Sequence, residues 1–292
     1  MANTAETSTE ILTEISAEMS AETSTLLHPT DFSADGALAF AHAVRLSLRG
    51  RQTLSLLNIA TSDMGPRRDG LRLVADLLSS WGLLPEKSAP EAIKTNLGFE
   101  VVSVGIPHED PRTAILDYIE HHPCDFAVFA TRDHRGLARW MERSAATRTL
   151  RKAKSLLLMV REGARGFVDP KTGEVTLKRV LMPVDGKLDP SLALQRLEAW
   201  LKNIGVAPEI RLIYVGNNPP KISPGPNGEF YPLNAREGVA APSILNFARS
   251  WSADLIAMPT ARRNGYLAAL TGSVTSEILD DARWPVLSIP AS

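Results

Sequence analysis

The sequence repeats itself, and this repeat constrains the fold more than any other feature. Asp254–Met258 (DLIAM) matches Asp125–Phe129 (DFAVF) at an offset of 129 residues, whereas Asp185 follows Asp31 by 154 residues. The two offsets differ by 25 residues, so the second copy lacks a segment in its middle. At 292 residues, the chain is long enough for each copy to bury a core of its own. We therefore predict two tandem copies of one folding unit.

Within each copy, short apolar runs alternate with patterns of helical period. Such alternation predicts an α/β fold in which a mostly parallel five-stranded sheet is covered by helices on both faces, a doubly wound domain. Strands are expected at 26–30, 53–59, 99–104, 126–130 and 156–160 in the first copy, and at 180–184, 210–215, 254–258 and 285–289 in the second.

The copies differ between their second and third expected strands. The first copy has a helical pattern at Leu71–Leu78, and a further helix is expected to begin at Asp110-Pro111. In place of the first of these, the second copy has the Pro-, Gly- and Asn-rich stretch Gly216–Gly238, which cannot hold a long helix. This stretch is either a surface loop or a lid over a pocket.

Composition shifts divide the chain into four segments. Residues 1–24 contain no Lys or Arg and are predicted to be a disordered acidic tail; an alternative is a partner-binding helix that uses Ile11, Leu12, Ile15 and Met19. The first domain is expected at 25–162 and the second at 179–292. Residues 163–178 join them as a linker, in which Glu174–Leu177 either extends the next strand or forms a small hairpin with Phe167-Val168.

Charge and motif content exclude several classes of function. Lys and Arg total 32 against 33 Asp and Glu, a balance that gives no basis for binding nucleic acid or an anionic membrane. No apolar run reaches the length of a membrane span, and the single Cys124 fits a reducing, cytoplasmic setting. His, Cys, Asp and Glu are not spaced as in a zinc site, and no phosphate-binding P-loop or nucleophile elbow occurs. We predict no metal-binding and no catalytic residues.

The best candidate for a ligand site lies in the second copy. Ligands of open parallel sheets bind beyond the carboxyl ends of the strands, where following helices present free N–H groups to anions. Residues at this edge that are expected to bind a cofactor are Pro183, Asp185, Val215, Arg262, Gly272, Ser273, Val274 and Thr275. An alternative is that Gly272 only forms a turn and that Ser273 only caps a helix.

Four motifs follow one another in the second copy and have weaker counterparts in the first: Val180–Gly186 (VLMPVDG), Asp254–Met258, Gly272–Val274 (GSV) and Trp284–Ile289 (WPVLSI). In their order and spacing, both copies resemble the universal stress protein domain. This resemblance implies an adenine nucleotide alpha hydrolase-like fold and a cytoplasmic, non-enzymatic role in stress response. It also implies a pseudo-dimer within the chain, with 156–160 touching 286–289, and allows a homodimer.

The resemblance also bears on ATP, which some members of this family bind through a loop with three glycines. In this chain, the first copy keeps none of these glycines and the second keeps one. ATP or another anion is therefore expected only in the second domain; the alternatives are a nucleotide-independent scaffold that binds protein partners, and a weakly ATP-hydrolysing enzyme. The three glycine positions hold Ala130, Asp133 and Arg143 in the first copy, and Pro259, Arg262 and Gly272 in the second.

Overall fold

The computed structural model describes residues 24–60, 69–131, 155–186, 188–222, 230–260 and 273–291. The first copy consists of β1 (Thr25–Pro29), α2 (Ala37–Gly50), β2 (Thr53–Ala60), α3 (Gly70–Ser80), α4 (Glu91–Leu97), β3 (Val101–Pro107), α5 (Pro111–His121), β4 (Phe126–Thr131) and β5 (Leu156–Arg161). The second consists of β6 (Arg179–Val184), α8 (Ser191–Asn203), β7 (Glu209–Val215), β8 (Leu233–Arg236), α9 (Ala240–Ser250), β9 (Leu255–Thr260), α10 (Ser273–Asp281) and β10 (Val286–Pro290).

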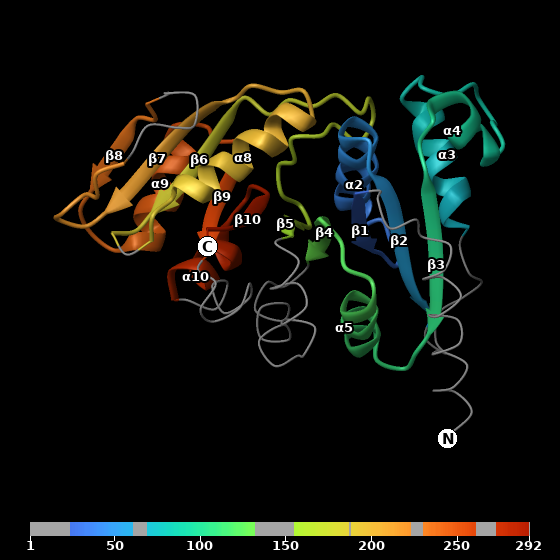
Figure 1. Cartoon of the computed structure of the whole chain (residues 1–292), viewed down its shortest axis with the longest axis horizontal. Helices are drawn as coiled ribbons and strands as arrows, with labels where there is room; N and C mark the ends of the chain where they lie inside the picture. Colours follow the sequence, from blue (N-terminus) through green and yellow to red (C-terminus); the bar gives the residue numbers. More distant parts are fainter. Residues whose placement is uncertain are drawn as a thin grey trace.

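All of these strands belong to one sheet, in the order β3-β2-β1-β4-β5-β10-β9-β6-β7-β8 (Figure 1). Each copy contributes five parallel strands, and the order of one copy is the reverse of the other. The copies join where β5 and β10 pair antiparallel, with Leu287 opposite Leu158. This arrangement confirms the predicted fold class and the predicted contact between 156–160 and 286–289, while each of these strands also pairs within its own copy.

Helices cover both faces of the sheet, and two cores result. On one face, α2 and α8 bury Val44 and Leu197, and on the other, α5 and α9 bury Ile119 and Ile244. Successive strand residues alternate between the two cores, which is why the strands read as continuous apolar runs. Helix α2 ends at Gly50, and Arg51 follows it in the left-handed conformation, with φ of 52°.

The connection between the second and third strands differs between the copies, as the offsets predict. In the first copy it contains α3 and also the short helix α4, which was not predicted. In the second copy, the stretch expected to be a loop or a lid contains β8, which pairs parallel with β7. The expectation of a loop or lid was wrong for these four residues. The strand was missed because β8 lies at the edge of the sheet, has exposed or half-buried side chains and lacks the apolar pattern of a central strand.

The linker forms the small hairpin that was one of its two predicted conformations. Val168 and Val175 form an antiparallel bridge, and Phe167 and Val168 are buried. His42 of α2 holds this hairpin: its Nε2 accepts hydrogen bonds from the N–H groups of Phe167 (3.1 Å) and Val168 (3.2 Å). The opposite ring nitrogen, Nδ1, lies 2.8 Å from the Leu38 carbonyl oxygen, which fixes the neutral tautomer. The linker is therefore packed against the first copy.

Candidate functional site

A cavity of about 200 Å³ opens at the carboxyl edge of the second copy. Four residues predicted for the ligand site line it together: Pro183, Asp185, Val215 and Val274. They meet because β6 pairs with both β7 and β9, so the ends of these strands lie side by side. The remaining lining residues are Val184, Leu188, Pro190, Ile213, Tyr214, Ala240, Ile244, Met258 and Pro259.

The other four residues predicted for the ligand site lie wholly or partly outside the described structure. Arg262 and Gly272 lie outside the described residues, which stop at 260 and resume at 273. Ser273 begins α10 and Thr275 lies in its first turn, but their side chains are also outside the described part. The first turn of α10 does reach the cavity through Val274. A helix therefore begins beside this cavity, as the sequence predicts.

Asp185 and Gly186 shape the turn that follows β6. The Leu188 N–H donates a hydrogen bond to Asp185 Oδ1 at 2.8 Å, which orients the carboxylate. At Gly186, no atom of the described residues other than its chain neighbours lies within 4 Å of the position that a Cβ would occupy. The turn is thus ordered by the aspartate and left open beside the glycine, so a ligand can approach the backbone closely.

The size and lining of the cavity suit one part of a nucleotide-sized ligand, and not the whole ligand. Its walls are mainly aliphatic, with the Tyr214 ring and the Asp185 carboxylate as the ionisable groups among the described lining residues. Ligand pockets usually measure about 300–1,000 Å³, so the described cavity matches a flat base or a small polar group and not an entire nucleotide. Sequence reasoning missed Tyr214, Ile244 and Met258, because apolar residues of this kind read as ordinary core.

The corresponding turn of the first copy is closed. Phe32 follows Asp31 there, has φ of 54° and is only 8% exposed. Its ring packs edge-on against Phe40, with centroids 6.1 Å apart. Of the three loop positions compared above, Ala130 lies on β4, and Asp133 and Arg143 fall outside the described residues. The first copy therefore fills with an aromatic side chain the turn that the second copy leaves open.

Two reactive residue types in the first copy are buried away from solvent. His28 bonds the Val128 carbonyl through Nδ1 at 2.8 Å, its Nε2 has no partner, and burial lowers its pKa to about 4. Burial also raises the pKa of the Cys124 thiol to about 12, which suppresses the reactive thiolate. His28 is therefore a buried, half-satisfied side chain of the strand end.

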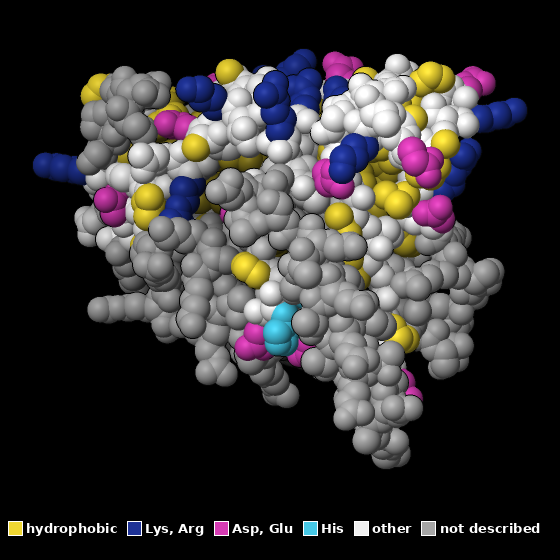
Figure 2. All heavy atoms as spheres, turned by 45° about the vertical axis from the view of Figure 1, so that its right-hand side comes forward, with side chains coloured by type: hydrophobic (Ala, Val, Ile, Leu, Met, Phe, Trp, Pro, Cys, Tyr) yellow, Lys and Arg dark blue, Asp and Glu magenta, His cyan; other side chains and the backbone are white. Residues whose placement is uncertain are grey.

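The described surface carries mixed charge in the view of Figure 2, where basic and acidic side chains are interspersed. No group of three or more His, Cys, Asp or Glu among the described residues is placed to hold a metal ion. Likewise, within the described part of the chain, no helix is both long and apolar enough to cross a membrane.

Comparisons with known proteins agree with this architecture. A universal stress protein from Archaeoglobus fulgidus DSM 4304 superposes with a TM-score of 0.56 at 17% identity, covering 92% of this chain and 96% of that one. A functionally unknown protein from Pseudomonas aeruginosa PAO1 gives a TM-score of 0.55 at 16% identity, covering 92% and 93%. A search of curated proteins gave no match. The model of the universal stress protein family matches residues 22–161 and 223–290, and the chain therefore belongs to that family.

Proposed function

We propose that this protein acts in stress response by binding an adenine nucleotide or a related anion in its second copy, and not by turning over a substrate. The observation that carries the proposal is the cavity at the carboxyl edge, where Pro183, Asp185, Val215 and Val274 meet at the start of α10. Apolar walls suit an adenine ring, and a helix N-terminus favours phosphate.

Two features support binding in the second copy over the first. The turn after β6 is open at Gly186, whereas Phe32 closes the equivalent turn. In sequence, Arg262 and Gly272 precede α10 and supply a positive charge and a residue without Cβ next to a bound phosphate. The first copy then serves as the built-in pairing partner that covers β10.

The mainly aliphatic chemistry of the described lining supports a non-enzymatic role. Asp185 and Tyr214 are its ionisable residues, and the Asp185 carboxylate already accepts a hydrogen bond from its own turn. We place this activity in the cytoplasm, where a lone buried thiol such as Cys124 stays reduced. We also expect protein partners to recognise the ligand-bound form of the protein.

Calorimetry on the full chain tests the proposal, with ATP, ADP and a cyclic nucleotide as probes. Binding heat is expected for at least one of them, and Gly272→Val should abolish it by placing a branched side chain against the phosphates. Asp185→Asn should weaken binding, whereas the matched change Asp31→Asn in the first copy should leave it unchanged. Absence of heat with all three probes would leave a nucleotide-independent scaffold, and steady phosphate release from ATP would indicate an enzyme.

A further inference from the structure

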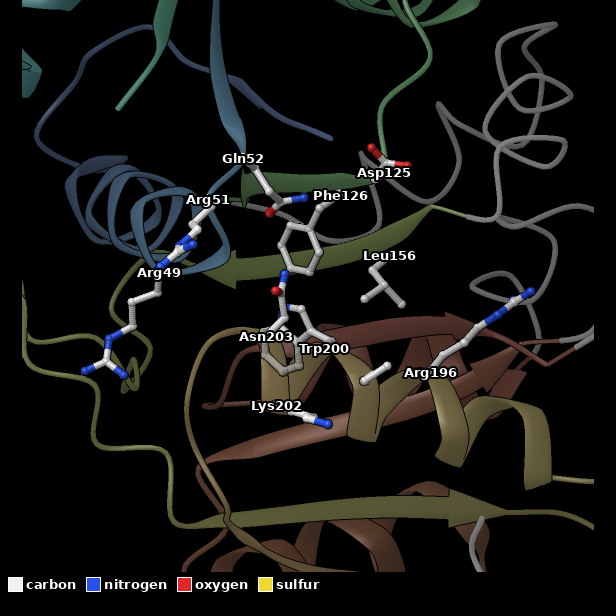
Figure 3. Close-up of a pocket in the computed structure, with 11 residues that line it drawn as sticks. Arg49, Arg51, Gln52, Asp125, Phe126, Leu156, Arg196, Trp200, Lys202 and Asn203 are labelled. Atoms are coloured by element: carbon white, nitrogen blue, oxygen red, sulfur yellow. The ribbon is translucent and has the colours of Figure 1, made fainter. Parts of the chain in front are cut away.

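A second and larger hollow, of about 840 Å³, lies where the two copies meet (Figure 3). It is far more open than the first and takes residues from both copies. From the first copy come the end of α2 and the starts of β4 and β5, and from the second comes one side of α8. Its lining residues are Arg49, Arg51, Gln52, Asp125, Phe126, Leu156, Arg196, Ala199, Trp200, Lys202 and Asn203.

Direct contacts between the copies fix the shape of this inter-domain hollow. Arg49 Nη1 donates to the Ile204 carbonyl at 2.9 Å, and Asn203 Nδ2 donates to the Gly50 carbonyl at 3.4 Å. Beneath them, the rings of Phe126 and Trp200 stack with centroids 5.7 Å apart and an interplanar angle of 12°. The hollow therefore has an aromatic floor built jointly by both copies.

The charge of the hollow differs from that of the whole protein. Four cationic side chains line it, against the single carboxylate of Asp125, although the chain as a whole has a net charge of -1. Two of the cations are exposed: Arg51, which directly follows α2, and Lys202, which lies on α8. Such a concentration of one sign inside a concave surface attracts an anionic occupant.

The N-terminal end of the described chain lies at the rim of this hollow. Gln52 Nε2 donates to Ser24 Oγ at 2.8 Å, and the Thr25 N–H donates to Asp125 Oδ2 at 3.0 Å. Gln52 and Asp125 are both lining residues. The tail that precedes Ser24 is thus tethered directly beside the cationic groups.

The composition of that tail matches the hollow. Residues 1–23 contain no Lys or Arg, and they include Ile11, Leu12 and Ile15 as apolar side chains for an aromatic floor. Glutamates recur in the tail at every fourth position: Glu6, Glu10, Glu14, Glu18 and Glu22. A tether this short keeps the local concentration of the tail high, roughly in the millimolar range.

We infer that the acidic tail of this chain docks in the inter-domain hollow, with its glutamates on Arg51 and Lys202 and its apolar residues toward Phe126 and Trp200. Like charges spaced four apart weaken a free helix, and pairing with these cations removes that repulsion. A docked tail covers the seam between the copies and competes with any other anion for it. This device is independent of the nucleotide cavity, which lies at a different edge of the second copy.

Paramagnetic relaxation measured by NMR on the full chain tests the inference. Cys124 is buried and its thiol is unreactive, so Ser16→Cys supplies a single site in the tail for a nitroxide label. We expect the label to remove the signals of the Trp200 indole N–H and the Asn203 side-chain amide. The signal of the Trp251 indole, which packs against the core of the opposite face, should stay sharp. About 0.5 M salt, where the Debye length falls to about 4 Å, should restore the lost signals.

A charge-reversed variant and a matched control decide the outcome. Arg51→Glu with Lys202→Glu should restore the lost signals, whereas Lys94→Glu with Arg249→Glu, which changes the net charge equally at exposed sites outside the hollow, should not. Signals that never weaken, or that weaken equally in the charge-reversed variant, would overturn the inference. So would loss of signal on an unlabelled chain mixed with a labelled one, because the tail would then occupy a second copy of the protein.

Discussion

The turn after the first strand of each copy is built in opposite ways. In the first copy, Phe32 folds back onto Phe40 and is buried, although this requires a positive φ. In the second, a Cβ added at Gly186 would have no atom of the described residues within 4 Å beyond its chain neighbours, and the preceding Asp185 lines a cavity. The junction between β5 and β10, by contrast, draws equally on both copies. The two copies therefore contribute alike to the pairing surface at β5 and β10. They differ in the turn after their first strand, which is filled by a side chain in the first copy and open in the second.

The largest expected difference between the copies is their response to acid. His28 and His42, both in the first copy, are fully buried with pKa values lowered by desolvation to about 4 from 6.5. These two histidines bind protons more readily in the unfolded chain than in the folded one. The folded state therefore keeps its full stability above pH 6.5 and loses part of it as the pH falls toward 4. The loss should be on the order of 3 kcal/mol for each histidine. Urea unfolding at pH 7 and at pH 4.5 measures it.

His28→Met sharpens this test, because Met182 occupies the same position of the second copy. The variant should flatten the pH dependence by about half, since one of the two buried imidazoles is gone. At pH 7 the change removes a buried Nε2 that has no partner, but it also removes the bond from Nδ1 to the Val128 carbonyl, so these two effects on stability oppose each other. An unchanged acid transition would show that the buried histidine does not set it.

Truncation of the filled turn gives the next largest effect. Phe32→Ala should lower the free energy of unfolding by about 3 kcal/mol, the usual cost of removing a buried aromatic ring. The substitution keeps a Cβ, so the strain of the positive φ is unchanged and the loss reports packing. Thermal and urea unfolding measure it. A loss below about 1 kcal/mol would contradict the description of a closed turn.

The open turn should tolerate the matching change. Gly186→Ala is expected to alter stability by less than about 0.5 kcal/mol, because no atom lies near the added Cβ and the residue has no positive φ. The same variant is expected to weaken nucleotide binding if the ligand approaches this turn closely. A large loss of stability without ligand would contradict the open space seen beside Gly186.

Much of the fold could be predicted from the sequence, because apolar runs and repeat offsets report local structure directly. The deletion in the second copy was placed correctly from two offsets. Helix α4 escaped prediction because it has only seven residues, between Pro90 and Gly98. Strand β8 escaped because its strand conformation comes from pairing with β7 and not from its own apolar pattern.

The site was predictable only where the residue type reveals its role. Asp185 and Val215 follow from their places at strand ends, whereas Tyr214 and Met258 look like core until the strand ends are placed side by side. The inter-domain hollow gave no sequence signal at all. Arg51 and Lys202 are far apart in a chain of balanced charge, and only the packing of α2 beside α8 brings them to one surface.

The asymmetry of the two copies is tested most directly by following backbone amide signals while ATP is added to the full chain. We predict that shifts concentrate at Val215 and Val274, which line the cavity of the second copy, and at Gly186, which follows the lining residue Asp185. Amides of Phe32 and Ala130 in the first copy should not move. Shifts centred on Phe32, or equal shifts in both copies, would contradict the division of the duplicated unit into one filled and one open half.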